Sequence, residues 1–222
     1  MSNNSNNNPE NLQKLIDIGI ALSKEKNINK LLENILNEAR NISHSDGGTL
    51  YLMIDNETRL NFEIMHTESK NIYYGGTGAP VPDTTYPIKL YINDEPNMHN
   101  VAAVCALEGK TINIHDAYND KKYDFTGTKG FDKKNHYYSK SFLNVPLKNH
   151  KDEVIGVIQL LNPTNDKKEI ITYSEYIVHL VESLASQVSI ALTNQLLIEE
   201  QKHLFKSFIQ LVAEALEKKD KT

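Results

Sequence analysis

Two short apolar runs separated by a charged turn stand out in residues 141–162. The runs are FLNVPL (142–147) and VIGVIQLL (154–161). Short runs rich in leucine and β-branched residues, bounded by turn formers, predict a β-hairpin that is buried on at least one face. Gly156 indicates that another backbone packs closely against the second strand, and Pro146, which lacks an N–H, is expected at an edge or bulge. We expect helices and loops to cover both faces of a sheet built around this hairpin.

Helical spacing dominates the first part of the chain. Apolar residues recur at steps of three and four from 28 to 42 and predict an amphipathic helix, which the glycine-rich segment 46–48 is expected to end. A shorter helix is predicted over 12–22, and Pro9 suits its start. The asparagine-rich residues 1–9 are expected to be a disordered lead-in.

Further strands follow from alternation and β-branched content. Residues 49–54 and 60–66 predict a second hairpin, and single strands are expected at 88–92 (IKLYI) and 111–115 (TINIH). Between them, a compact apolar helix is predicted from Asn100, its N-cap, to Gly109, its terminator.

Two segments, 71–87 and 116–140, show no regular period. The first holds several glycines and prolines and is long enough to be a lid or binding loop. A mobile surface excursion is the alternative, because loop length alone does not decide function. The second segment is polar but rich in aromatic residues.

One long helical pattern runs from residue 174 to about 219. Steps of four and three from Ile190 to Ala215 trace a heptad seam that is apolar except at Asn194 and Gln201, with a second stripe beside it. No later residue of this chain could cover 200–218, so we expect a homodimer through the N- and C-terminal helices. Ordinary core packing is the alternative.

Composition narrows the function classes. The chain of 222 residues has a net charge of −5 and a pI near 5.9, without a basic block to follow a nucleic-acid backbone. The single cysteine, Cys105, allows no intrachain disulfide and fits a reducing compartment. The sequence lacks a secretory signal pattern, and no apolar run approaches the roughly 18 residues of a membrane span. We therefore expect a cytoplasmic protein without nucleic-acid or membrane partners.

Catalytic signatures are weak. The eight histidines lack the spacing of a zinc site, and no phosphate-binding loop precedes a helix. Cys105 lies in an apolar stretch, which favours an inert buried thiol over a nucleophile. For the dipeptide His115-Asp116, a turn-forming role of Asp116 is favoured over metal binding. The chain is not expected to be an enzyme or to bind a metal.

The order of these elements resembles a GAF domain over residues 28–195. Five segments carry the resemblance: 45–52 (SDGGTLYL), 101–110 (VAAVCALEGK), 111–118 (TINIHDAY), 142–162 and 184–187 (LASQ). It implies an α+β fold with a central antiparallel sheet of about six strands, helices on both faces and a long C-terminal helix. The domain is expected over residues 10–195, followed by a signalling helix or coiled coil over 196–222 that leads to an output domain.

The resemblance also implies a ligand pocket between the sheet and residues 96–140. Thr49 occupies a position where the family has a small polar residue able to hydrogen-bond a ring edge. Asn100 and Ala103 open the small helix, whose free N–H groups would hold an anion. Tyr138 and Ser139 correspond to the family's Tyr-x-Thr segment.

Two carboxylates and two aromatic residues complete the predicted site. Asp116 and Asp132 would accept hydrogen bonds from a ring N–H or a hydroxyl, and Tyr123 and Phe131 would stack on a planar ligand. The alternative is that the aromatic residues close the domain core and the pocket is collapsed.

By resemblance, the chain is a sensor module for a cyclic nucleotide or another small planar ligand, with no certain cofactor. The signature of the cyclic-nucleotide-binding members is incomplete: Asn162 is present, but Pro163 and Ile177 replace its charged pair. A ligand-free domain that serves for dimerisation and spacing is the alternative. Residues 204–222 resemble the helix before an HD-GYP-type phosphodiesterase domain, so we expect a sensor fragment of a longer phosphohydrolase.

Overall fold

A seven-stranded antiparallel sheet forms the centre of the domain in the computed structural model, which describes residues 8–54 and 56–219. The strand order is β3-β2-β1-β9-β8-β7, and β4 pairs with β2. The sheet strands are β1 (Ser45–Ile54), β2 (Arg59–Thr67), β3 (Ile72–Gly75), β4 (Ile88–Lys89), β7 (Ile112–Ile114), β8 (Phe142–Lys148) and β9 (Val154–Pro163). A separate ribbon pairs β5 (Tyr91–Ile92) with β6 (Glu95–Pro96). The predicted antiparallel α+β fold is confirmed.

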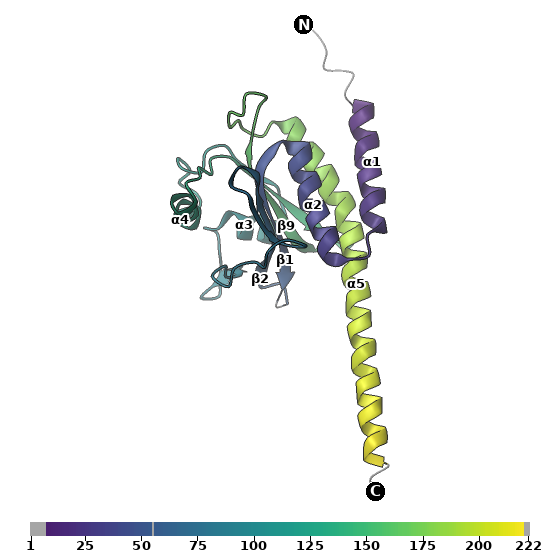
Figure 1. Cartoon of the computed structure of the whole chain (residues 1–222). Helices are drawn as coiled ribbons and strands as arrows, with labels where there is room; N and C mark the ends of the chain where they lie inside the picture. Colours follow the sequence, from purple (N-terminus) through teal and green to yellow (C-terminus); the bar gives the residue numbers. More distant parts are fainter. Residues whose placement is uncertain (1–7, 55, 220–222) are drawn as a thin grey trace.

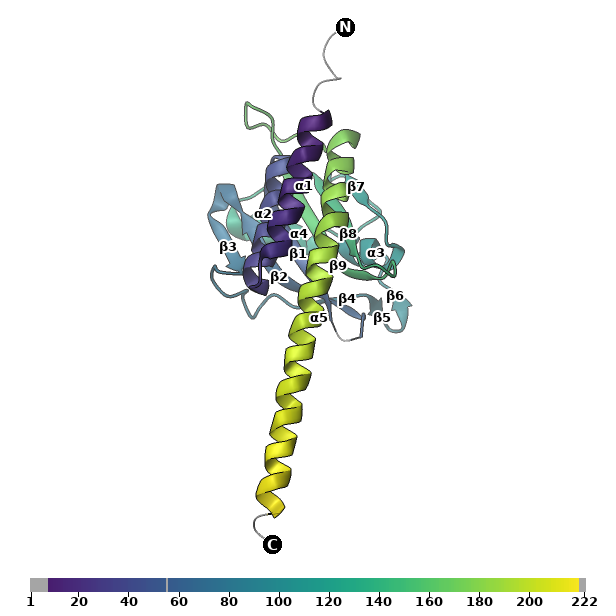
Figure 2. The same ribbon diagram turned by 90° about the vertical axis from the view of Figure 1, so that its right-hand side faces the viewer.

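Helices cover both faces of the sheet (Figure 1). One face carries α2 (Ile28–Ser43) and the first half of α5 (Glu175–Lys219), with α1 (Asn8–Lys24) packed against these two helices, and the other face carries α3 (Val101–Glu108) and α4 (Thr126–Asn135). A short 3-10 helix, η1 (Glu68–Lys70), follows β2. Helices α1 and α5 lie side by side, and α5 continues far beyond the sheet (Figure 2).

Successive side chains of the central strands point to opposite faces of the sheet and join two different hydrophobic cores. On β1, Leu50 and Leu52 pack towards α2 and α5, whereas Tyr51 packs with the cluster that contains α3. On β9, Ile158 joins the first core and Val157 the second. Because successive strand side chains point to opposite faces, this pattern leaves residues such as Thr49 and Gln159 facing the α3 and α4 side.

The predicted hairpin is present as β8 and β9, and its two special residues behave as expected. A Cβ at Gly156 would collide with the carbonyl oxygen of Tyr51 on the neighbouring strand, so a side chain is excluded there. Strand β7 pairs with β8 only as far as Asn144. Pro146 lies two residues further along β8, where β7 no longer pairs with the strand. The strand therefore reaches an edge of the sheet at the proline, as predicted.

The predicted end of the second helix is wrong. Helix α2 ends at Ser43, where His44 takes a left-handed conformation with φ 54° and its N–H bonds to the carbonyls of Arg40 and Asn41. Residues 46–48 belong to β1 instead. A Cβ at Gly48 would lie only 3.0 Å from the carbonyl oxygen of Gln159, so the glycine permits close strand pairing rather than ending a helix.

Four further stretches differ from the prediction. The strand expected over 88–92 is broken into β4 and β5, because the buried Leu90 turns and its N–H bonds to the carbonyl of Thr58. Segment 71–87 contains β3, and segment 116–140 contains α4. Of the lead-in expected over 1–9, Asn8 and Pro9 begin α1, and residues 1–7 lie outside the described part.

The long C-terminal helix is confirmed as α5. Its first half is buried on the sheet through Val181, Leu184, Val188 and Leu192, whereas side chains such as Leu204 are exposed. By length and composition alone, the window Glu175–Glu214 would also suit a membrane span. Because much of the apolar surface in its first half packs against the sheet, this is weak evidence for a span.

Candidate functional site

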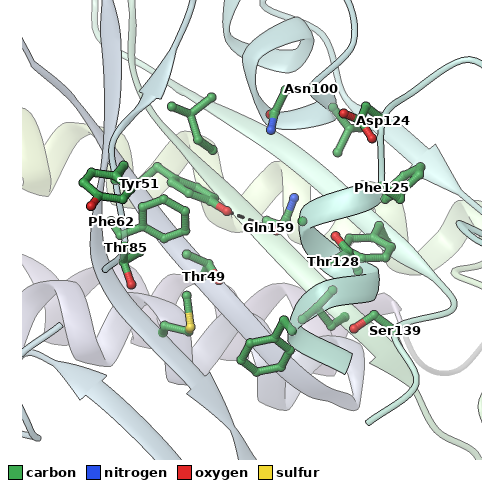
Figure 3. Close-up of a pocket in the computed structure, with 18 of the residues that line it drawn as sticks. Thr49, Tyr51, Phe62, Thr85, Asn100, Asp124, Phe125, Thr128, Ser139 and Gln159 are labelled. Atoms are coloured by element: carbon green, nitrogen blue, oxygen red, sulfur yellow. Dashed lines mark hydrogen bonds between the residues drawn. The ribbon is translucent and has the colours of Figure 1, made fainter. Parts of the chain in front are cut away.

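A cavity of about 420 Å³ lies between the sheet and the layer formed by α3, α4 and the residues around them (Figure 3). Strands β1, β2, β8 and β9 supply its floor, and residues 84–88 supply one rim. The walls are largely aromatic and aliphatic: Tyr51, Phe62, Met65, Tyr86, Ile88, Val101, Phe125, Phe131, Phe142 and Leu161. The pocket is therefore open rather than collapsed.

A polar row crosses the cavity floor over three strands. Thr49 of β1 pairs with Gln159 of β9, which pairs with Asn144 of β8. The Tyr51 hydroxyl donates to Gln159 Oε1 at 3.2 Å, and Gln159 Nε2 donates to Asn144 Oδ1 at 2.8 Å. Burial raises the pKa of the Tyr51 hydroxyl, which keeps it a neutral donor. The floor thus offers an oriented amide and a threonine hydroxyl.

Asn100 caps α3 at the cavity wall, as predicted. Its Oδ1 accepts the backbone N–H groups of Ala102 at 3.0 Å and Ala103 at 3.1 Å. With the oxygen engaged, the amide nitrogen of Asn100 points into the cavity (Figure 3). The N–H groups of Ala102 and Ala103 are therefore occupied, and Ala103 is fully buried and does not line the cavity.

Asp124 lines the cavity just before α4, and the sequence prediction missed it. Its Oδ1 accepts the backbone N–H of Thr126 at 2.8 Å, and its own N–H donates to the carbonyl of His99 at 2.6 Å. Hydrogen bonds from the Thr126 side chain and backbone hold the pKa of Asp124 below its usual value, so it is charged. An aspartate two residues before Thr126 is a typical turn and helix-start signal that could have found this position.

Asp132 was predicted to accept a hydrogen bond from a ligand, but its carboxylate is bonded within the protein. Only 3% exposed, it accepts hydrogen bonds from the Ser139 N–H at 2.8 Å, the Ser139 hydroxyl at 2.7 Å and the Tyr118 hydroxyl at 2.7 Å. It does not line the cavity, but it holds Ser139 on the wall. Its oxygens serve to fasten α4 to the chain that follows it.

Three more predicted site residues do not line the cavity. Asp116 accepts hydrogen bonds from its following turn, including Asn119 Nδ2 at 2.8 Å, in keeping with the favoured turn-forming role. Tyr123 does not line the cavity but is buried in the cluster that also contains Phe125 and Phe142 of its wall. Tyr138 is 46% exposed, with its ring 4.5 Å from that of Tyr118. The structure therefore brings together Thr49, Asn100, Phe131 and Ser139, and their contact with a ligand stays a prediction.

Segment 71–87, which leads into the rim residues 84–88, is anchored to α2. The Thr77 hydroxyl donates to Glu33 of α2 at 2.6 Å. Thr84, Thr85 and Tyr86 line the cavity, and Tyr86 is 77% exposed. The part of segment 71–87 beside the cavity is thus placed where a lid would lie.

Groups that would support catalysis are sparse around this cavity. The described part of the chain contains no cluster of three or more His, Cys, Asp or Glu side chains arranged to hold a metal. Cys105 is buried in α3, and burial raises the pKa of its thiol. The Cys105 thiol is therefore unsuited to act as a nucleophile.

The family model of the GAF domain matches this chain over residues 27–192. The cGMP-specific 3',5'-cyclic phosphodiesterase of Drosophila melanogaster is 24% identical over 183 residues, which are 80% of this chain and 15% of that protein. The counterpart from Drosophila ananassae is 24% identical over 181 residues, again 80% of this chain and 14% of that protein. The chain thus spans only a small part of the curated relatives it matches.

Solved structures share the fold at low sequence identity. The GAF domain from an Acinetobacter phosphoenolpyruvate-protein phosphotransferase is 16% identical, with a TM-score of 0.60 over 90% of this chain and 99% of that chain. That from Coxiella burnetii is 14% identical, with a TM-score of 0.61 over 89% and 99%. A GAF domain/HD domain protein from Geobacter sulfurreducens is 11% identical, with a TM-score of 0.53 over 79% and 98%.

Proposed function

This chain belongs to the GAF domain family, and from this premise we propose that it binds a small planar ligand and passes that event to a downstream domain. Domains of this family are typically regulatory small-molecule-binding modules and not catalytic ones. The ligand would be a cyclic nucleotide or another small planar compound. The proposal includes a cytoplasmic location and a homodimer, with no nucleic-acid or membrane partner.

The observation that carries this proposal is the cavity of about 420 Å³ between the sheet and α3 and α4. Small-molecule sites are concave, mostly apolar and fitted with a few convergent polar groups. This cavity has aromatic walls, and Thr49, Asn100 and Gln159 bring polar groups to it. Aromatic faces pack well against a planar ring, whose edges would meet these polar groups.

The route to the rest of the protein runs through β9. Gln159 faces the cavity, and its neighbours Ile158 and Leu160 pack in the core that contains Leu184 and Val188 of α5. A ligand that favours one arrangement of the floor would therefore favour one position of α5. Such a shift requires different ligand affinities for the two arrangements.

The distal half of α5 suits a partner helix. Leu204, Phe208 and Leu211 are 62%, 60% and 65% exposed and follow the spacing of a coiled-coil seam. We propose that a second copy covers them, in a homodimer formed through both α1 and α5. The HD-GYP-type output domain proposed after α5 agrees with the GAF domain/HD domain protein that shares this fold.

A thermal-shift screen tests the binding proposal directly. The panel contains cyclic mono- and dinucleotides, purines and small metabolites, and mass spectrometry of denatured protein detects any compound that copurifies. A ligand at 100 times its dissociation constant stabilises the folded state by about 2.7 kcal/mol, which is a clear shift. No shift and no copurified compound would favour the ligand-free dimerisation role, which the replacement of the charged pair by Pro163 and Ile177 also favours.

A further inference from the structure

We propose that the partner of α5 is a second copy of this chain that runs parallel to it, in a register set by Asn194 and Gln201. This inference rests on the homodimer of the proposed function and adds its direction. Positions along the seam of α5 fall into the d and a sets of a heptad. The d set is Ile190, Leu197, Leu204 and Leu211, and the a set is Asn194, Gln201, Phe208 and Ala215. A polar residue at an a position specifies the register of a coiled coil.

The two amide residues of the seam distinguish a parallel partner from an antiparallel one. In a parallel pair in register, each seam position meets the same position of the other chain, so Asn194 meets Asn194 and Gln201 meets Gln201. An amide both donates and accepts hydrogen bonds, so two like amides can satisfy each other. In an antiparallel pair, a positions meet d positions, and each amide would lie against a leucine or an isoleucine. A buried amide without a hydrogen-bond partner is costly, which favours the parallel pair.

The apolar surface of the seam continues towards α1, which lies beside α5 (Figure 2). A Cβ at Gly19 would collide with Gln187 Oε1, so the two helices approach each other closely there. Ile16 and Ile20 flank this glycine and are 41% and 50% exposed, and Ile190, three residues after Gln187, is 65% exposed. Exposed apolar side chains thus extend from the distal half of α5 to α1, as an interface through both helices requires.

Polar and apolar layers divide the seam into two parts. Asn194 and Gln201 come directly after the part of α5 that is buried on the sheet, and the exposed Leu204, Phe208 and Leu211 follow them. A polar layer makes a coiled coil less stable than an apolar one. The distal layers would therefore hold the dimer together, while the amide layers adjust when α5 shifts on the sheet. In a parallel dimer, the shifts of both copies reach the same end of the helix pair.

Spin-label distances at three matched sites test the direction of the partner. The variants are Glu199→Cys, Lys206→Cys and Ala213→Cys, at exposed positions one heptad apart on the outer side of the seam. Cys105 is buried, so the unsubstituted chain should take up no label and is the control. A parallel dimer in register predicts the same distance between the two labels at all three sites. In any antiparallel register, at least two neighbouring sites differ by about 21 Å along the axis, because a helix rises about 1.5 Å per residue and both chains contribute.

Leucine in place of the two amides tests what sets the register. The double variant Asn194→Leu/Gln201→Leu replaces both polar layers by apolar ones, and a polar a residue fixes the register at a cost in stability. We expect sedimentation equilibrium to show dimerisation that is at least about tenfold tighter. The label distances should broaden, because other registers become possible. The matched control is Gln210→Leu, which removes an amide from an exposed position off the seam and should change neither quantity.

The outcomes separate this inference from the proposed function. Unequal label distances within a dimer would overturn the parallel arrangement and leave the homodimer standing. A light-scattering mass above that of two copies would also overturn the inference. Weaker association of the double variant, or distances that stay as narrow as without it, would overturn the role of the amides. If the unsubstituted chain is a monomer, the proposed homodimer fails and the inference fails with it, whereas the thermal-shift screen still decides ligand binding.

Discussion

The Tyr51 hydroxyl donates a hydrogen bond of 3.2 Å to the Gln159 side-chain oxygen and thereby ties β1 to β9 on the cavity floor. Gln159 in turn donates to Asn144 of β8. The amide of Gln159 therefore has one orientation, fixed from both ends. A binding surface that is already ordered loses less entropy when a ligand arrives.

Removing this hydroxyl should loosen the floor. Tyr51→Phe leaves the partly buried Gln159 oxygen without its donor, and a lost hydrogen bond of this kind costs about 1 kcal/mol. We expect urea unfolding to report a free energy lower by about that amount. Tyr91→Phe, at an exposed tyrosine of β5, is the control and should change little. Equal stability of the two variants would show that the Tyr51–Gln159 bond does not stabilise the fold.

Asn162 of β9 should stabilise the fold by holding residues 137–141, which follow α4, against the sheet. Its Oδ1 accepts from Lys140 N and Ser141 N, and its Nδ2 donates to Tyr137 Oη at 3.0 Å and to the Tyr138 carbonyl at 2.7 Å. Asn162→Ala leaves several buried groups unpaired, each worth about 1–3 kcal/mol. The free energy of unfolding should fall by at least about 2 kcal/mol.

Asn165→Ala provides the comparison for Asn162, because Asn165 also makes several side-chain hydrogen bonds but sits in an exposed turn. Its substitution should cost less than about 1 kcal/mol, since water replaces the lost partners. A larger loss at Asn165 than at Asn162 would contradict the assignment.

High pH should weaken the attachment of α4. The hydrogen bond that Tyr118 donates to Asp132, followed by burial, raises the pKa of the tyrosine from 10.0 to about 12. The folded state therefore holds this proton more tightly than the unfolded chain. Its contribution is complete below pH 10 and is lost as the pH rises from 10 to 12. The urea concentration at the unfolding midpoint should decrease from pH 9 to pH 11.5, and this decrease should be smaller in Tyr118→Phe than in the wild type. Equal decreases in the two proteins would argue against the role of this hydrogen bond.

Association through α5 should depend on its exposed apolar face. Phe208→Glu places a charge among Leu204, Leu211 and their neighbours, where a partner helix would have to bury it. Light scattering at micromolar concentration should show a dimer for the wild type and a monomer for this variant. The control is Glu200→Gln, at an exposed acidic position of the same helix, which should remain dimeric. A monomeric wild type would contradict the proposed association through the apolar face of α5.

The elements predicted best were those with a strong local pattern. The β8–β9 hairpin, α5 and the Asn100 cap of α3 each follow from a few adjacent residues. Helix α4 was missed because Gly127 and Gly130 weaken its helical propensity, and its few apolar residues do not make a regular stripe. Tertiary contacts stabilise it instead, chiefly through Asp132.

The site was predicted only in part, for a physical reason. Thr49 faces the cavity because strand alternation fixes its side, which a sequence can show. Whether a carboxylate is free or engaged depends on which donors the fold brings to it. Asp132 has three donors and is engaged, whereas Asp124 uses one oxygen for Thr126 and stays on the wall. Sequence spacing does not distinguish these two cases.

The most direct test of the central claim, that this cavity is the ligand site, is to fill it. Gly127 lines the cavity and Gly130 does not, and a Cβ at either position meets no atom within 4 Å. Leucine at each site should therefore be tolerated in α4. The measurement is the thermal shift produced by the strongest compound of the screen. The account predicts at least tenfold weaker binding in Gly127→Leu and unchanged binding in Gly130→Leu, whereas equal shifts in both variants and the wild type would contradict it.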